Sequence, residues 1–255
     1  MSKIVCFSGI FKREILRFLQ QRSRLFSALV RPLLWLFVFA AGFRNALGLS
    51  IMEPYHSYIL YEEYIIPGLA CMIVLFNSMQ SSLSMVYDRE MGSMKVLLMS
   101  PFSKPFLLLS RLTANACISV LQVAVFFACA LLVDVKLSLV GYVMSLLVIF
   151  LAGLLLGALG VLLAGHIKQL ENFAGTMNFV IFPMFFMSTA LYPLYKIQES
   201  SDILYHLCRN NPFTLAVESV RFAMYEQWAS LPLAILAGLT TLLCVLASRN
   251  FNTKP

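Results

Sequence analysis

A run of charged side chains lies between two long apolar segments of this 255-residue sequence, at residues 87–101 (YDREMGSMKVLLMSP). Its candidate functional residues are Asp88, Arg89, Glu90, Gly92, Ser93, Lys95 and Pro101. A solvated loop beside a membrane would carry similar charges. The apolar stretch after Ser93, however, is too hydrophobic to lie free in water, and Pro101 ends the helix that it favours. We therefore interpret residues 88–101 as a short helix parallel to the membrane, with an apolar face that a protein groove must cover.

Polar side chains also occur inside the apolar segments. Within residues 65–86, four of them lie on or beside one helical face by i, i+4, i+7 spacing, and two more lie within residues 173–191. Such groups in hydrocarbon must meet either other helices or a hydrated cavity, so interhelical hydrogen bonding and the lining of a substrate route both stay open. These residues are Asn77, Gln80, Ser81, Ser84, Thr176 and Asn178.

Motifs for catalysis and nucleotide binding are missing from the sequence. It contains no HExxH, GxSxG or GxxxxGK[ST], and its three histidines lie in three separate loops, so we predict no catalytic residue and no metal site. The six cysteines form no CxxC pair, and buried cysteine behaves as a small hydrophobe. Because the chain has no phosphate-binding loop, it cannot hold ATP by that mechanism. If the protein pumps a solute, its energy comes from a partner.

The composition is that of a polytopic membrane protein. Hydrophobic residues make up 60% of the chain and charged residues 12%, whereas soluble domains carry about 25% charge. No polar run is long enough for a soluble domain, so residues 1–255 form one membrane domain. The net charge is +7, but the cations gather at the ends of apolar segments. That distribution sets topology and argues against nucleic acid as a partner.

Hydropathy predicts an all-α fold with six transmembrane helices. The expected spans cover about residues 29–49, 65–86, 106–133, 137–164, 173–191 and 229–247. Residues 10–26 have the pattern of an amphipathic helix lying in the membrane surface, although a simple basic flank would look similar. Residues 192–228 are too polar to span and predict two short helices, at 202–207 and 212–225.

The orientation follows from the basic residues. With both termini inside, fourteen of the 19 Lys and Arg residues lie on the inner side. Since inner loops carry the excess of Lys and Arg, we predict that both termini and the segment 88–101 are cytoplasmic.

The sequence resembles the permease subunits of ABC-2 type ATP-binding-cassette exporters, particularly the drug-export and lipo-oligosaccharide branch typified by daunorubicin-resistance permeases. The resemblance begins at Pro67-Gly68, near the start of the second span. It continues through a "DRE, G-[ST], LL, [SA]-P" pattern at residues 88–101. A second feature runs from Asn211-Pro212 to Arg221, before the last span.

The resemblance implies a half-transporter of the cell inner membrane. Two copies of the chain would pair with two separate ATPase subunits, which hold ATP and Mg²⁺, and would move a drug, lipid or lipid-linked saccharide. Residues 10–26 and 88–101 would contact the ATPase, while residues 192–228 would form a partly re-entrant outer gate containing Asn211, Pro212 and Arg221. The alternatives are an integral membrane enzyme and a scaffold or assembly subunit of an ATPase complex that moves no solute.

Overall fold

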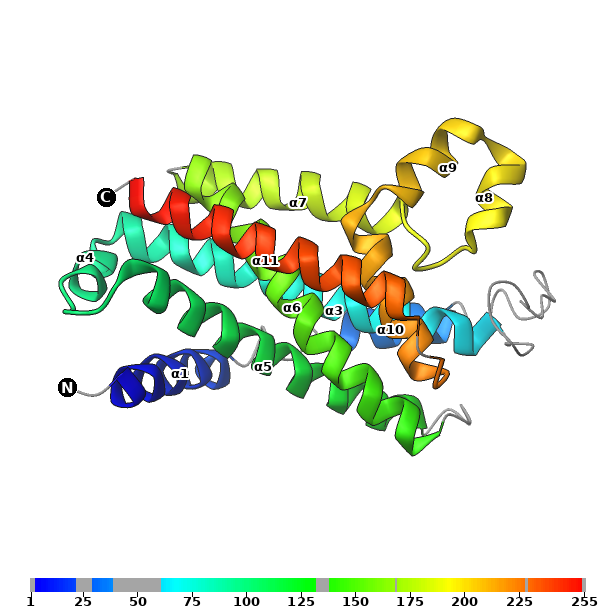
Figure 1. Ribbon diagram of the computed structural model, residues 1–255, viewed down its shortest axis with the longest axis horizontal. Helices are drawn as coiled ribbons and strands as arrows, with labels where there is room; N and C mark the ends of the chain where they lie inside the picture. Colours follow the sequence, from blue (N-terminus) through cyan, green and yellow to red (C-terminus); the bar gives the residue numbers. More distant parts are fainter. Residues whose placement is uncertain are drawn as a thin grey trace.

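The computed structural model describes residues 3–21, 29–38, 61–131, 138–167, 169–227 and 229–253. Regular structure in these ranges is entirely helical, which confirms the prediction of an all-α protein. The labelled helices in Figure 1 are α1 (Lys3–Gln20), α3 (Tyr61–Glu90), α4 (Ser93–Leu98), α5 (Lys104–Leu131), α6 (Leu139–His166), α7 (Leu170–Phe186), α8 (Leu194–Ser200), α9 (Asp202–Arg209), α10 (Pro212–Met224) and α11 (Ser230–Thr253). One more apolar helix covers Leu29–Val38.

Four of the described helices are long and apolar enough to cross a membrane. They are Glu63–Glu90 within α3, the whole of α5 and α6, and Ser230–Phe251 within α11. α7 has 17 residues. That length corresponds to about 26 Å, a little less than the roughly 30 Å of a bilayer core. The predicted first span, 29–49, extends beyond the described helix Leu29–Val38. The protein is therefore a membrane protein with several spans, and the six-span topology stays a prediction.

The helices begin and end at different residues from those predicted. α1 begins at Lys3, and residues 22–26 of the predicted surface helix 10–26 lie outside the described residues. α3 continues through Glu90, so α4 covers only residues 93–98 of the predicted helix 88–101. Gly92 separates the two helices because its φ of 74° is left-handed, a conformation that glycine adopts without steric cost.

The predicted outer region 192–228 holds three short helices where the sequence indicated two. α8 precedes the two expected helices, which appear as α9 and α10. α7 ends at Phe186, one turn beyond Pro183, and the Met187 amide donates to the Pro183 carbonyl at 2.9 Å. In Figure 1, α8 and α9 lie at one end of the long axis and α4 at the other. We call these the α8–α9 end and the α4 end.

α6 lies at the centre of the bundle, where it packs against α3, α5, α10 and α11 (Figure 1). Glycines on α6 allow this close packing. A Cβ at Gly153 would lie 3.1 Å from Ala116 of α5, and one at Gly160 would lie 2.3 Å from the Ser82 hydroxyl of α3. Small residues are typical of tight helix contacts in membranes, because they let two backbones approach each other.

α3 has a close backbone contact of the same kind, between Gly68 and Ala190, and a glycine substitution tests it. A Cβ at Gly68 would lie 2.3 Å from the backbone oxygen of Ala190, so Gly68→Ala must displace backbone. We expect Gly68→Ala to lower the free energy of unfolding by about 1–3 kcal/mol. Gly238→Ala is the matched control, because nothing lies within 4 Å of the added Cβ. Thermal unfolding of the detergent-solubilised protein measures both variants, and equal losses of stability would contradict the packing.

Candidate functional site

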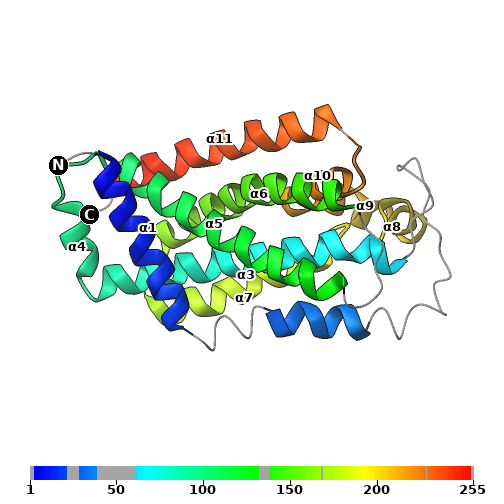
Figure 2. The same ribbon diagram turned by 90° about the horizontal axis from the view of Figure 1, so that it is seen from below.

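The carboxylate of Asp88 lies at the centre of a charged cluster at the α4 end. Arg17 of α1 donates to both of its oxygens, at 2.7 and 3.1 Å. Arg111 of α5 donates to the same carboxylate at 3.2 Å. Glu14 of α1 lies 3.6 Å from Arg111 and 2.7 Å from Arg13. These five residues, the Asp88 cluster, join α1, α3 and α5, and Figure 2 shows α1 crossing the bundle there.

Asp88, Glu14 and Arg111 are shielded from solvent, whereas the side chains of Arg13 and Arg17 are 39% and 27% exposed. Asp88 is 3% exposed and Arg111 is 6% exposed. Ser84 accepts hydrogen bonds from Arg17 at 2.6 Å and from Arg111 at 3.2 Å. A buried charge that loses its partner is costly, so each member of the cluster depends on the others. The arrangement holds α1 against the two spans as one unit.

Two members of the cluster lie on α1, outside the candidate spans, and both have shifted pKa values. Burial raises the pKa of Glu14, but the nearby charges of Arg111, Arg13 and Arg17 outweigh it, so the pKa lies below its ordinary value. The hydrogen bond to Asp88 raises the pKa of Arg17. Both shifts favour the charged forms that make the ion pairs.

The two residues after Asp88 bind two further helices. Arg89 donates to the carbonyl of Ala164, in the last turn of α6, at 3.0 Å. Glu90 accepts a hydrogen bond from the Leu170 amide, at the start of α7, at 3.2 Å. A cation at a helix C-terminus and an anion at a helix N-terminus both match the helix dipole. The run Asp88–Glu90 therefore ties the end of α3 to α1, α5, α6 and α7.

α4 follows this run and packs against the bundle on one side only. The Ser93 hydroxyl donates to the Asp88 carbonyl at 3.1 Å. Met94 is buried in a cluster with Met85, Leu108 and Phe251. Lys95 is exposed, and so are the apolar side chains at three positions on or beside α4. Their exposed fractions are 61% for Met91, 73% for Val96 and 80% for Met99.

The residues expected at an outer gate have structural partners. Asn211 caps α10 by accepting from the Phe213 amide at 2.9 Å, and its side chain donates to the carbonyls of Met184 and Met187 at 2.8 and 2.7 Å. Pro212 is the first residue of α10, where its missing amide donor costs little. Asn211 thus joins the start of α10 to the end of α7.

Arg221 is fully buried in α10. Its guanidinium lies 3.7 Å from the centroid of the Tyr64 ring of α3. It donates to the Thr189 carbonyl at 2.7 Å and to Glu218 at 2.5 Å, and the Tyr64 hydroxyl donates to the same Thr189 carbonyl. Arg221 thus fixes α10 to α3 and to the turn after α7.

The polar residues predicted inside the spans separate into several groups. Asn77 donates to Asn115 at 3.2 Å and to Ser119 at 2.8 Å, both on α5, which is interhelical hydrogen bonding. Ser84 accepts hydrogen bonds from Arg17 and Arg111 of the Asp88 cluster. Ser81 lines a small gap beside Arg111. Thr176 donates to a carbonyl of its own helix at 2.8 Å.

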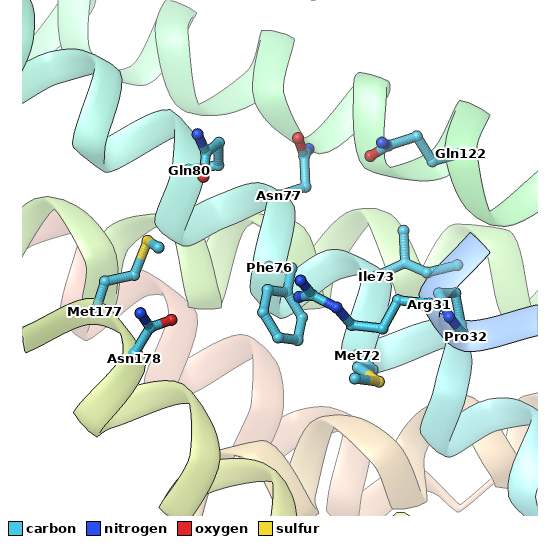
Figure 3. Close-up of a pocket in the computed structure, with 10 residues that line it drawn as sticks. All are labelled: Arg31, Pro32, Met72, Ile73, Phe76, Asn77, Gln80, Gln122, Met177 and Asn178. Atoms are coloured by element: carbon cyan, nitrogen blue, oxygen red, sulfur yellow. The ribbon is translucent and has the colours of Figure 1, made fainter. Parts of the chain in front are cut away.

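Asn77, Gln80 and Asn178 line one pocket between α3 and α7, shown in Figure 3. At Asn77 this adds to the interhelical hydrogen bonds given above. The lining of a substrate route stays a prediction at these three positions.

The sequence reasoning missed the partners of Asp88. Arg17 is one of several cations on the predicted surface helix 10–26, and Arg111 lies in the first turns of the predicted span 106–133, so neither pattern indicates a partner for Asp88. Two signals were available in the sequence. Glu14 is an acid in an otherwise basic helix, and Arg111 lies well inside the apolar segment that follows residue 104. Neither signal identifies which helix supplies the partner.

The family of the chain follows from a comparison with known proteins. The model of the ABC-2 type transporter family matches residues 6–225. The chain belongs to the ABC-2 type transporter family. The matched residues include the Asp88 cluster, α4 and Arg221, so the features described above lie within the family domain.

Relatives of this ABC-2 transporter chain carry a transport name. The protein named "putative transport permease ycf38" of Pyropia yezoensis is 28% identical over 223 residues, covering 84% of this chain and 72% of its own length. The protein of the same name in Cyanophora paradoxa is 28% identical over 218 residues, with the same coverage. These findings support a transport permease, and the drug-export branch stays a prediction.

A pair of matched substitutions tests the role of Asp88 in the ABC-2 chain. Asp88→Asn weakens the ion pairs that hold α1, and breaking a buried pair costs roughly 3–5 kcal/mol. We expect trypsin to cleave α1 at Lys12 and Arg13 at least about tenfold faster, because cleavage follows the population of the open state. Glu90→Gln, the same chemical change two residues away, should leave this rate unchanged since Glu90 contacts α7. Equal rates in the two variants would disprove the assignment.

Proposed function

We propose that this chain is the permease subunit of an ATP-driven exporter of amphiphilic molecules. In this proposal, two copies of the chain associate in the inner membrane with a separate ABC ATPase that supplies ATP and Mg²⁺. The α4 end, with both termini, faces the cytoplasm. The distribution of Lys and Arg residues and the family of the chain support this arrangement.

The observation that carries the proposal is the exposed apolar surface of α4. Met91, Val96 and Met99 are exposed at the α4 end, although this end also carries the charge of Lys95. An apolar patch beside charged groups is typical of a protein docking site. Because the chain has no phosphate-binding loop, a partner that binds here is the natural source of ATP energy.

The bonds of the run Asp88–Glu90 provide a physical route for that energy. A displacement of α4 acts on Asp88 through Ser93, and from there on α1 and α5 through the ion pairs. Arg89 and Glu90 extend the connection to α6 and α7. A space of about 150 Å³ lies between α4 and the helices α3, α6 and α11. These charged residues thus act inside the permease, and the apolar residues around α4 make the contact with the ATPase.

Charge substitutions on α4 test this proposal. Val96→Asp and Met99→Asp place a carboxylate where an apolar side chain would be buried against the ATPase, a burial worth about 1.5–3 kcal/mol. We expect binding of the partner ABC ATPase to weaken at least about tenfold. Stimulation of its ATP hydrolysis by the permease should fall in parallel. Both side chains are exposed, so the thermal stability of the permease alone should not change.

The matched control is Ile203→Asp, because Ile203 is 75% exposed on α9 at the opposite end of the bundle. This variant should bind and stimulate the ATPase like the unchanged protein. Equal effects of Val96→Asp and Ile203→Asp would overturn the α4 docking site. ATPase binding without ATP-dependent accumulation of fluorescent lipid or drug in inverted vesicles would favour the scaffold alternative.

A further inference from the structure

A polar pocket lies halfway along α3, on the side of the helix Leu29–Val38. It has a volume of about 130 Å³ and is lined from that helix and from α3, α5 and α7. Figure 3 shows its polar side chains facing one region from these separate helices. They are Arg31, Asn77, Gln80, Gln122 and Asn178. The apolar members Met72, Ile73, Phe76 and Met177 complete the lining, together with Pro32.

Gln122 of α5 is the buried polar group of this pocket. Its side chain is 3% exposed, and neither its oxygen nor its nitrogen has a hydrogen-bond partner among the described residues. A buried amide without partners costs free energy, because it has lost its hydrogen bonds to water. The amide is therefore placed to bond a molecule that enters the pocket.

Arg31 supplies the charge of the pocket. Its guanidinium lies 4.1 Å from the centroid of the Phe76 ring, a cation–π contact that holds it beside α3. Phe76 is near the middle of α3, which runs from Tyr61 to Glu90. Within the part of the chain that the structure describes, no carboxylate forms an ion pair with Arg31. Arg31 is exposed in the single chain, and it lies beside the middle of an apolar helix without a carboxylate partner among the described residues. Such a cation favours an anionic ligand.

Aromatic side chains extend from the pocket towards the α8–α9 end. Phe182 follows Asn178 by four residues on α7, so it lies on the same helical face. The Phe182 ring stacks with Phe186 at a centroid distance of 6.2 Å, and Phe186 meets Trp35 of the helix Leu29–Val38 at 6.1 Å. Phe182 and Phe186 are exposed in the single chain. The polar pocket thus opens beside an apolar row between two helices.

We infer that this pocket binds the anionic headgroup, a phosphate or carboxylate, of an amphiphile whose apolar part lies along Trp35, Phe182 and Phe186. Arginine binds phosphate and carboxylate with two parallel hydrogen bonds, and the amides of Gln80, Gln122 and Asn178 supply further donors. The lining contains no acidic side chain among the described residues, so nothing in it repels an anion. The inference rests on the proposed function and names the chemical class of its substrate.

The experiment measures binding to the full-length chain in detergent, without ATPase or ATP. Fluorescently labelled phosphatidic acid is the probe, and unlabelled phosphatidic acid, phosphatidylcholine and inorganic phosphate are the competitors. We expect phosphatidic acid to compete at least about tenfold better than phosphatidylcholine. Arg31→Gln should weaken probe binding about tenfold, Arg31→Lys less, and Gln122→Met severalfold. Arg209→Gln is the matched control, since Arg209 lies over the Tyr205 ring on α9, at the α8–α9 end.

Three results would overturn the inference. They are equal competition by the two lipids, equal loss of binding in Arg31→Gln and Arg209→Gln, and competition by inorganic phosphate as strong as that by phosphatidic acid. The last result would assign the pocket to a free anion. Because the assay uses no nucleotide, headgroup binding that depends on Arg31 can hold while ATP-dependent export fails. The proposed function and this inference are thus tested separately.

Discussion

The buried carboxylate of Asp88 is the interaction on which the α4 end depends. It is the shared partner of Arg17 and Arg111, which come from helices far apart in the sequence. Removing the Arg111 guanidinium and the Asp88 carboxylate from water is costly, and the cost is offset only while both keep their partners. The cluster therefore favours joint movement of α1, α3 and α5. A protein that must carry a movement from a surface helix into its spans requires such a rigid connection.

Packing around α6 gives the bundle a similar constraint in its apolar part. The glycines of α6 bring α3 and α5 close, so a displacement of α3 cannot be absorbed by loose side chains. At the α8–α9 end, Arg221 connects α10 to α3 through Tyr64 and Thr189. α3 is thus held near both ends by contacts with the buried residues Arg111 and Arg221. The residues in the middle of α3 line the polar pocket. A movement that begins at α4 can therefore reach the pocket through a single helix.

Much of the fold could be predicted from the sequence, because each membrane helix is a continuous apolar segment that the hydropathy of its own residues reveals. The apolar runs gave the all-α class and the approximate positions of α5, α6 and α11. In the charged run, the prediction of one helix over 88–101 missed the break before α4, because Gly92 adopts a left-handed conformation between Glu90 and Ser93. The partners of the charged residues in that run could not be predicted from the sequence. Asp88, Arg89 and Glu90 are adjacent in sequence, but successive residues on a helix point in different directions and meet different neighbours.

The sequence by itself determined that this chain is a helical membrane protein of the ABC-2 transporter family and that it lacks a phosphate-binding loop. Only the tertiary structure decided that the charged run is bonded inside the permease, leaving Met91, Val96 and Met99 exposed. It also placed Arg31 and Gln122 in one pocket, although 91 residues separate them. The physical reason is that hydropathy is a property of each segment, whereas ion pairs and pockets depend on which faces of distant helices meet.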